Sequence, residues 1–224
     1  MSPLGPRHQM LEQFAQVAKA LGHLHRLDLL EYLAQGERGV DELAETSGLS
    51  VANTSQHLLQ LRRAGLVTSR KQGVRVIYRL SGDDVVDLLS ALRHTAERHV
   101  AEVDQVVDGF FRERDGLEPV SRSELLRRAK DGLVTVLDVR PGHEFEAGHI
   151  SGAINLPLNN LEQHLNDLPK DREVIAYCRG PYCVLAFEAV ALLRDKGLEA
   201  RRLEDGYPEW KAAGLPLESR GGQI

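Results

Sequence analysis

The sequence predicts two domains, the first mainly α-helical with one β-hairpin and the second an α/β domain with a parallel sheet. The chain has 224 residues, which is enough for one large domain or two small ones. Apolar residues recur at helical spacing through most of the first hundred residues. In the second half, short apolar runs typical of buried parallel strands alternate with helical patterns. We therefore place the domains at residues 1–111 and 117–224.

The composition excludes several classes of protein. Hydrophobic residues make up 42% of the chain and charged residues 27%, which is the balance of a globular protein rather than of a disordered or fibrous one. No apolar run approaches the roughly 18 residues that a membrane-spanning helix needs. The first residues lack the apolar core of a secretory signal, and two cysteines are too few for a disulfide scaffold. We expect a cytoplasmic protein with no membrane partner.

Three helices are expected in the first part of the chain. The leucines of residues 25–35 have helical spacing, and a short helix follows over residues 41–46. Ser50 is a good N-cap for a third helix, which is expected to run to about Ala64. A glycine follows each of these helices: Gly36, Gly48 and Gly65.

A β-hairpin is expected directly after the third helix. Residues 67–71 and 74–78 are rich in β-branched side chains and flank Gln72 and Gly73, which is the pattern of two strands joined by a tight turn. Helix, tight turn, helix and hairpin, in that order, form the layout of a winged helix-turn-helix.

The distribution of charge adds to this prediction. A net charge of −5 argues by itself against a nucleic-acid-binding protein. However, no acidic residue occurs between Ser47 and Gly82, and a locally basic surface in that window could bind phosphates. The basic residues of the window are Arg62, Arg63, Arg70, Lys71, Arg75 and Arg79.

The third helix has the features of a recognition helix. Its N-terminal end carries small and polar side chains, and that end of a recognition helix meets base edges in the major groove. The basic residues that follow would contact the backbone phosphates, which positions a protein without reading sequence. The alternative is a solvated helix face beside an ordinary basic hairpin. The candidate DNA-binding residues are Ser50, Asn53, Thr54, Ser55, Gln56, His57, Arg62, Arg63, Arg70, Lys71 and Arg75.

A long helix is expected from Asp83 to residue 111. Its apolar positions are separated by three or four residues, which is typical of a helix that packs against another long helix. Such a helix outside a compact domain usually finds its partner in a second subunit, so we predict a homodimer through residues 83–111. Residues 112–119 are expected to be a linker. The apolar positions are Val85, Leu89, Leu92, Ala96, Val100, Val103, Val107 and Phe110.

This half of the chain resembles the ArsR family of dimeric bacterial repressors over about residues 11–108. The resemblance rests on the sequence LGHLHRL at residues 21–27, SQHL at 55–58 and LRRAGLV at 61–67. It implies a homodimer that binds double-stranded DNA, and a two-fold symmetric protein matches a palindromic operator.

The resemblance does not extend to a metal site. Many family members have a Cys-x-Cys pair where this chain has Val40-Asp41-Glu42-Leu43. A second familiar site would use His99 and Glu102, but its upstream partners here are Val86 and Leu88. Half a site cannot hold a four-coordinate zinc ion, so we predict no metal and no other cofactor.

The second half predicts alternating helices and strands. Ser121 and Glu124 form a capping-box pattern that opens a helix to about Ala129. The remaining expected elements are strands at residues 134–139 and 173–177, a helix over 183–196, a strand at 200–203 and a short helix at 208–213.

A cysteine stands where one of these strands meets a loop and a helix. The apolar strand ends at Tyr177, and Cys178 follows it directly. Backbone N–H groups of such a loop, together with the positive end of the helix dipole, stabilise an anion. We therefore expect the pKa of the Cys178 thiol to be lowered, with Arg179 adding positive charge nearby. The alternative is an inert buried cysteine.

This half resembles a single-domain rhodanese over about residues 117–220. The resemblance rests on LDVR at residues 137–140, GHISGAINLP at 148–157, the loop that begins at Cys178, and DGY at 205–207. It implies that Cys178 carries a sulfane sulfur as a persulfide, that Asp138 and Arg140 support the loop, and that His149 belongs to a structural turn and is not catalytic. The active-site loop is Cys178, Arg179, Gly180, Pro181, Tyr182 and Cys183.

Loop length favours sulfur chemistry over phosphate chemistry. Phosphatase-like relatives have one residue more in the loop and a histidine before the cysteine, where this chain has Tyr177. Many rhodaneses have an arginine where this chain has Cys183. Without this arginine we expect inefficient turnover of the anionic donor thiosulfate. Cys183 could instead attack a persulfide or sulfenate on Cys178 and close a disulfide, or it packs as a small apolar residue.

These observations lead to one preferred hypothesis and two alternatives. The preferred hypothesis is a homodimeric transcriptional repressor whose Cys178 accepts sulfane sulfur from thiosulfate or a low-molecular-weight persulfide and thereby alters DNA affinity. The first alternative is a sulfurtransferase enzyme with an accessory DNA-binding domain. The second is a metal-sensing repressor with a passive rhodanese fold.

Overall fold

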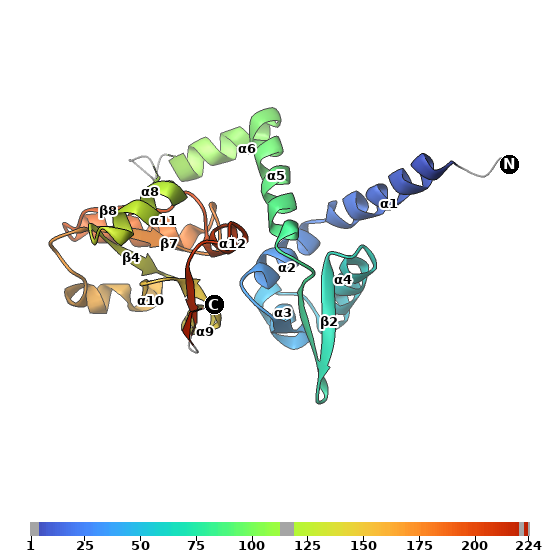
Figure 1. Ribbon diagram of the computed structural model, residues 1–224, viewed down its shortest axis with the longest axis horizontal. Coiled ribbons are helices and arrows are strands. Elements are labelled where there is room, and N and C mark those ends of the chain that lie inside the picture. Colours follow the sequence, from blue (N-terminus) through green and yellow to red (C-terminus); the bar gives the residue numbers. More distant parts are fainter. Residues whose placement is uncertain (1–4, 113–118, 220–221, 224) are drawn as a thin grey trace. The chain divides into compact units, whose positions relative to one another are not determined.

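The computed structural model describes residues 5–112, 119–219 and 222–223 (Figure 1). The chain divides into two compact units, Met1–Val85 and Val86–Ile224, here called the N-terminal and the C-terminal unit. In the described ranges, no helix is both long enough and apolar enough to cross a membrane. Most of the expected linker, residues 113–118, lies outside the described residues.

The N-terminal unit has the predicted winged helix-turn-helix fold. Its sheet is antiparallel, in the order β1-β3-β2, and the long hairpin β2–β3 forms the wing (Figure 1). The core contains several fully buried leucines, among them Leu29, Leu43 and Leu58. The elements are α1 (Pro6–Leu21), α2 (Leu24–Ala34), β1 (Arg38–Gly39), α3 (Val40–Ser47), α4 (Val51–Arg63), β2 (Val67–Gln72) and β3 (Arg75–Leu80).

Local signals in the sequence set the ends of these elements. Ser50 caps α4, because its hydroxyl accepts a hydrogen bond from the Asn53 N–H at 3.3 Å. Gly48 ends α3 with φ 67°, and Gly73 turns the hairpin with φ 60°. Both angles lie in the left-handed region, which glycine enters without steric cost. The helix–turn–helix geometry therefore follows from residues that the sequence analysis singled out.

The prediction of one continuous helix over residues 83–111 is wrong. Helix α5 (Asp84–His99) ends before Val100, whose backbone is extended at φ −114° and ψ 105°. Helix α6 (Ala101–Val106) then starts in another direction and passes into a stretch of π-helix, η1 (Val107–Arg112) (Figure 1). The apolar repeat identifies one face of the segment, but it does not guarantee continuity. The β-branched Val100 is also a residue that readily adopts extended geometry.

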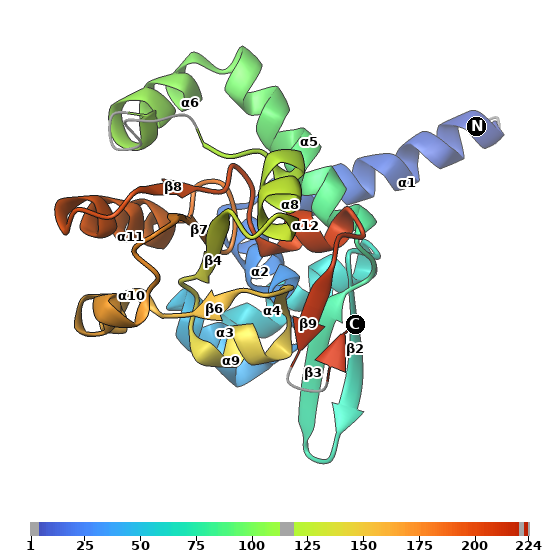
Figure 2. The same ribbon diagram turned by 60° about the vertical axis from the view of Figure 1, so that its left-hand side comes forward.

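The C-terminal unit contains the predicted parallel sheet, in the order β6-β4-β7-β8 (Figure 2). A small antiparallel sheet, β10-β9-β5, lies beside it in the chain's second half. After η1 the elements are α8 (Arg122–Lys130), β4 (Val134–Asp138), α9 (Gly142–Ala147), β5 (His149–Ile150), β6 (Ile154–Asn155), α10 (Leu158–Leu161), the 3₁₀ segment η2 (Glu162–Asp167), β7 (Glu173–Tyr177), α11 (Val184–Asp195), β8 (Ala200–Arg202), α12 (Tyr207–Ala212), β9 (Leu217–Ser219) and β10 (Gly222–Gln223).

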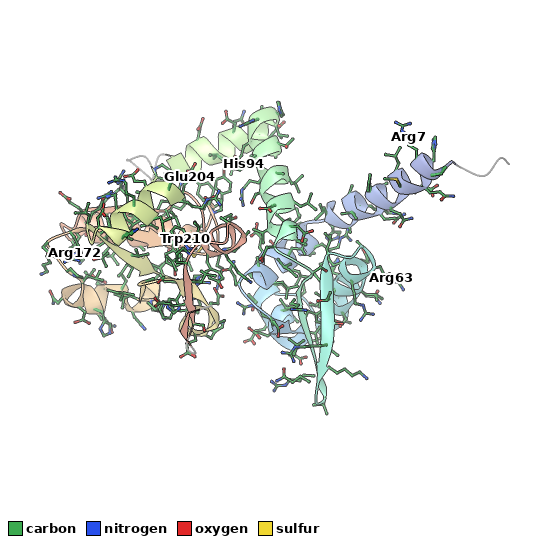
Figure 3. All side chains as sticks on the ribbon, in the orientation of Figure 1. Arg7, Arg63, His94, Arg172, Glu204 and Trp210 are labelled. Atoms are coloured by element: carbon green, nitrogen blue, oxygen red, sulfur yellow. A yellow bond between two sulfur atoms is a disulfide. The ribbon has the colours of Figure 1, made fainter. Side chains whose placement is uncertain are left out.

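Both faces of the parallel sheet are buried, as expected for α/β architecture. Along β7, Val174 and Ala176 point into a core shared with α10 and α11, and Cys178 continues that row beyond the strand's end. Ile175 and Tyr177 point into the opposite core, which contains residues of α8 and α12. Among the side chains of Figure 3, Trp210 of α12 lies inside this second core, where it is 2% exposed. The alternation places Cys178 at the carboxyl end of a strand buried on both faces.

Candidate functional site: a cysteine loop and a basic surface

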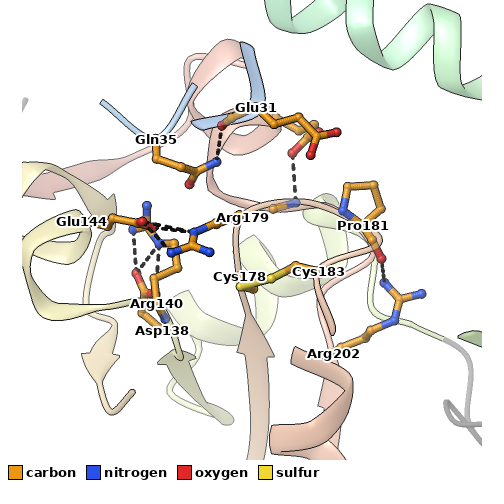
Figure 4. The surroundings of a disulfide bond; sticks show 12 residues. Glu31, Gln35, Asp138, Arg140, Glu144, Cys178, Arg179, Pro181, Cys183 and Arg202 are labelled. Atoms are coloured by element: carbon orange, nitrogen blue, oxygen red, sulfur yellow. Dashed lines mark hydrogen bonds and ion pairs between the residues drawn. A yellow bond between two sulfur atoms is a disulfide. The ribbon is translucent and has the colours of Figure 1, made fainter. Parts of the chain in front are cut away.

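The two cysteines are joined by a disulfide in the structure (Figure 4). Cys178 follows the last residue of β7, and Cys183 is the N-cap of α11, with the two Cα atoms 6.1 Å apart. The strand–loop–helix arrangement therefore has the geometry expected from the sequence. Cys178 is 1% exposed. Since both sulfur atoms are in the disulfide, the lowered pKa of a free Cys178 thiol stays a prediction.

The loop packs closely against the start of α12. The Tyr207 N–H donates to the carbonyl of Cys178 at 3.0 Å, and the Cys183 N–H donates to the carbonyl of Gly180 at 3.1 Å. A Cβ atom on Gly206 would overlap the backbone of Gly180. The φ angle of Gly206, −116°, is one that any residue can adopt. Glycine is required here because a side chain would prevent the close approach of the two backbone segments.

Arg179 is held by a buried carboxylate that the sequence analysis did not single out as a site residue. Its Nε lies 3.1 and 3.0 Å from the two carboxylate oxygens of Glu144, and its Nη2 donates to Oε1 at 2.7 Å (Figure 4). Glu144, on α9, is 2% exposed. A forked pair of this kind is strong and directional. The positive charge that the sequence places beside Cys178 is therefore largely compensated.

Asp138 and Arg140 form a fully buried ion pair at the end of β4, with Arg140 Nη2 2.7 Å from Asp138 Oδ2. Arg140 also donates to the Gly148 carbonyl at 2.8 Å. Burial lowers the pKa of Arg140, but the adjacent Asp138 outweighs burial, and the pKa is raised above its usual value. Gly148 is the C-cap of α9, so Arg140 holds the C-terminal end of the helix that carries Glu144. Support of the cysteine loop by Asp138 and Arg140, through α9 and the Glu144–Arg179 pair, stays a prediction.

His149 lies in the short strand β5, directly before the turn at residues 151–152, and not in the turn itself. Its ring stacks on Phe145, with centroids 3.6 Å apart and planes at 11°, and its Nδ1 lies 2.8 Å from the Phe145 carbonyl oxygen. The side chain is buried in β5.

Tyr182 links the loop to α5 within the C-terminal unit. Its hydroxyl donates to Oε1 of Glu97 at 2.7 Å, and its ring lies 4.8 Å from the ring of Phe111. Burial first, and then Glu97, raises the pKa of Tyr182 to about 12, so the hydroxyl is protonated near neutrality. Glu97 was not expected as a site residue, because it lies 85 positions from Tyr182 in the chain.

The N-terminal end of α4 presents only part of the predicted base-reading set. Asn53 and Gln56 are exposed, and Ser55 and His57 are partly exposed. Thr54 corrects the prediction: it is fully buried, and its hydroxyl donates to the Ser50 carbonyl at 3.1 Å, so it lies in the core. Position 54 falls on the face that α4 turns inward.

The predicted cations remain at the surface of the N-terminal unit. Arg63, Lys71 and Arg75 are exposed, and Figure 3 shows Arg63 extending outward from the unit. Arg62 is exposed and donates to the Ser69 hydroxyl at 3.2 Å. Arg70 forms an ion pair with Glu37 at 2.6 Å. The stretch between Ser47 and Gly82 contains no acidic residue, but Glu37, which precedes it in the sequence, places a carboxylate beside the hairpin.

Three histidines lie together in the N-terminal unit. The ring of His57 on α4 is 4.6 Å from that of His23 and 5.7 Å from that of His25. The Nδ1 of His57 is buried without a hydrogen-bond partner. Burial, followed by the charges of His23, Arg26 and His25, lowers the pKa of His57. Among the residues that the structure describes, no group of three or more His, Cys, Asp or Glu side chains is arranged to hold a metal ion.

The fold and the two sites define a winged helix-turn-helix regulator that is joined to a rhodanese-like domain. Residues 25–69 match the family described as bacterial regulatory protein, arsR family, and residues 121–213 match the rhodanese-like domain. The HTH-type transcriptional regulator Rv0324 of Mycobacterium tuberculosis is 44% identical over 93% of this chain and 92% of its own length. The chain therefore belongs to the ArsR family of DNA-binding transcriptional regulators and carries a rhodanese-like domain.

Two further relatives each match one half of the chain. A sulfurtransferase of Allochromatium vinosum is 30% identical over 45% of this chain and 92% of its own length. The structure of the homodimeric winged helix-turn-helix DNA-binding domain of Mb0332 from Mycobacterium bovis is 36% identical. It covers 45% of this chain and 93% of its own, with a TM-score of 0.41.

Proposed function

We propose that this ArsR-family regulator is a homodimeric repressor that responds to sulfane sulfur. Cys178 takes up the sulfur as a persulfide, Cys183 resolves that persulfide to a disulfide, and the state of the pair sets the affinity for a palindromic operator. The observation that carries the proposal is the Cys178–Cys183 disulfide at the carboxyl end of β7, in a chain whose other unit is a DNA-binding fold. The proposed location is the cytoplasm, where the DNA is.

The chemistry needs only a persulfide donor and the two thiols. A donor R–S–SH transfers its outer sulfur to Cys178, which gives R–SH and Cys178–S–SH. The Cys183 thiolate then attacks the Cys178 sulfur, the new S–S bond forms, and hydrogen sulfide leaves. The sulfane sulfur is reduced to sulfide, and the two cysteines are oxidised by two electrons. A Cα separation of 6.1 Å is within the range that a disulfide spans.

The proposed DNA contacts follow from exposure. Asn53 and Gln56 would read bases from the major groove, since their amides can pair with adenine and both are exposed on α4. The exposed Arg63, Lys71 and Arg75 would contact phosphates. Thr54 is no longer part of the proposed interface.

The proposed dimer is supported by exposed apolar side chains. Met10 and Phe14 on α1 are 57% and 60% exposed, and Leu88 and Leu92 on α5 are 38% and 43% exposed. A second copy of the chain would cover such surfaces. Because the segment bends at Val100, we restrict the proposed seam within residues 83–111 to α5.

Trapping the intermediate tests this proposal. Wild-type protein, treated with a low-molecular-weight persulfide, is expected to release sulfide and form an intramolecular disulfide. Cys183→Ser is expected to hold one extra sulfur atom on Cys178, seen by mass spectrometry, and to release no sulfide. Equal sulfide release from both proteins would contradict a resolving role for Cys183.

A sulfurtransferase function remains as a second candidate, favoured by the likeness of the C-terminal half to the Allochromatium vinosum sulfurtransferase. It predicts continuous turnover with thiosulfate that persists in Cys183→Ser. It also predicts that sulfur treatment leaves the DNA affinity unchanged.

A further inference from the structure

The side chain between the two cysteines reaches out of the loop to a helix. Tyr182 directly precedes Cys183, so the disulfide fixes its backbone within one residue of a cross-link. Its hydroxyl donates to Glu97 of α5 at 2.7 Å, across 85 positions of sequence. This bond therefore joins the sulfur loop to the helix that leads from the N-terminal unit into the C-terminal unit.

Further contacts strengthen the same junction. The Tyr182 ring packs on Phe111 of η1, whose ring lies 5.0 Å from that of Phe187 on α11. Arg93, one turn before Glu97 on α5, lies 3.9 Å from Glu97 and forms an ion pair with Glu209 of α12 at 3.0 Å. Within the C-terminal unit, α5 is thus bonded to the loop through Glu97 and to α12 through Arg93.

The surroundings of Cys178 are tight, whereas those of Tyr182 leave room. Cys178 is 1% exposed in a packed core, so an added sulfur atom cannot enter without displacing a neighbour. Beside Tyr182 lies a cavity of about 220 Å³ lined by residues of α5, η1 and the loop. Opening the disulfide and adding sulfur to Cys178 would therefore move the Tyr182 end of the loop more easily than the strand end.

We propose that the Tyr182–Glu97 hydrogen bond is the contact through which the sulfur state of the Cys178–Cys183 loop acts on α5. Tyr182 is a positioning residue. The Tyr182–Glu97 hydrogen bond forms when Cys178 and Cys183 are joined in the disulfide, and it weakens when the loop carries thiols or a persulfide. This inference rests on the proposed function, because it explains how a change at Cys178 reaches the DNA-binding unit.

The test uses the full chain and a fluorescent operator fragment from the chromosomal region upstream of the protein's own gene. The measured quantity is the ratio of DNA affinities between the thiol form and the persulfide-treated form, with the state of Cys178 checked by mass spectrometry. An allosteric coupling predicts a ratio of about 5–150-fold in the wild-type protein.

Glu97→Ala removes the acceptor, keeps a good helix former, and is expected to bring the ratio to within about twofold of one, while sulfide release stays at the wild-type level. Glu97→Gln keeps an acceptor oxygen and is expected to restore most of the ratio. Tyr182→Phe, which keeps the ring against Phe111, is also expected to bring the ratio of DNA affinities to within about twofold of one. Sulfide release is compared only in the Glu97 variants, because Tyr182 belongs to the active-site loop. Glu102→Ala, at an exposed position on α6, is the matched control and should leave the ratio unchanged.

The outcomes separate the two proposals. A wild-type ratio that survives in Glu97→Ala and Tyr182→Phe overturns the Tyr182–Glu97 link and leaves the sulfur-responsive function standing. A ratio of one in the wild-type protein overturns the function, and the link with it. A ratio lost in Glu97→Ala together with sulfide release also overturns the link, because the bond would then only hold the loop in shape.

Discussion

The cysteine loop of the C-terminal unit and the basic hairpin of the N-terminal unit differ in how their positive charges are compensated. In the loop, Arg179 forms a forked pair with Glu144, which is 2% exposed, so a buried carboxylate compensates the positive charge. On and near the hairpin, Arg63, Lys71 and Arg75 are exposed to solvent. The Arg179–Glu144 pair holds the loop in one conformation before a ligand binds. The exposed cations of the hairpin can instead bind a polyanion such as DNA. Substitutions in the loop should therefore affect folding and chemistry, whereas substitutions on the hairpin should affect DNA binding alone.

The largest effect is expected at Gly206. In Gly206→Ala the added Cβ would overlap the backbone of Gly180, so either the loop or α12 must shift. Overpacking of this kind costs about 1–3 kcal/mol of stability. Urea unfolding should show the loss, and persulfide uptake by Cys178 should fall with it. Gly142→Ala is the control, because its Cβ would meet only an ordinary contact at 3.6 Å. Equal stability of the two variants would show that the close approach is unimportant.

An effect of similar size on stability is expected at Glu144. Glu144→Ala leaves Arg179, whose side chain is 29% exposed, without its carboxylate partner. Because the Arg179 side chain is partly exposed, we expect a loss of about 1–3 kcal/mol rather than the full cost of an isolated buried charge. The unfolding free energy in urea measures it. Glu188→Ala, at an exposed position of α11, is the control. A loss below about 0.5 kcal/mol would mean that the pair contributes nothing beyond a surface salt bridge.

On the hairpin we expect changes in DNA affinity without changes in stability. Lys71→Ala should weaken binding to all sequences equally and flatten the slope of log affinity against log salt by about 0.9 for a lost phosphate contact.

A second change on the same surface should have the opposite effect. Arg70 is paired with Glu37, so Glu37→Gln should tighten DNA binding by removing a carboxylate from the surface. Fluorescence anisotropy over a salt series checks both. A Lys71→Ala defect confined to one operator sequence would contradict a phosphate contact.

The smallest effect is expected from the pH dependence of His57. Its pKa is lowered by burial and then by His23, Arg26 and His25, so the unfolded chain takes up a proton at higher pH than the folded chain does. Its contribution to stability is therefore fully present above the ordinary histidine pKa of about 6.5, and it is lost as pH falls through the folded value. Urea midpoints at neutral and mildly acidic pH should differ less in His57→Gln than in the wild-type protein. An unchanged difference would exclude His57 as its source, and His8→Gln serves as the control.

The sequence predicted local features well and long-range partners poorly. Ser50 and Ser121 cap α4 and α8 as expected, because capping depends on residues only three positions apart. The partners Glu144 and Glu97 lie 35 and 85 positions from the loop residues that they bind, and no local pattern marks them. Thr54 was misplaced because a polar residue near a helix start can also bond to its own backbone and turn inward.

The central claim is that the state of Cys178 controls DNA affinity. Its most direct test is fluorescence anisotropy of operator DNA with the reduced protein and with the persulfide-treated protein, for the wild-type chain and for Cys178→Ala. The account predicts that treatment changes the affinity of the wild-type protein and leaves that of Cys178→Ala unchanged. Reduced and treated wild-type proteins that bind with the same affinity would contradict it, as would a change that persists in Cys178→Ala.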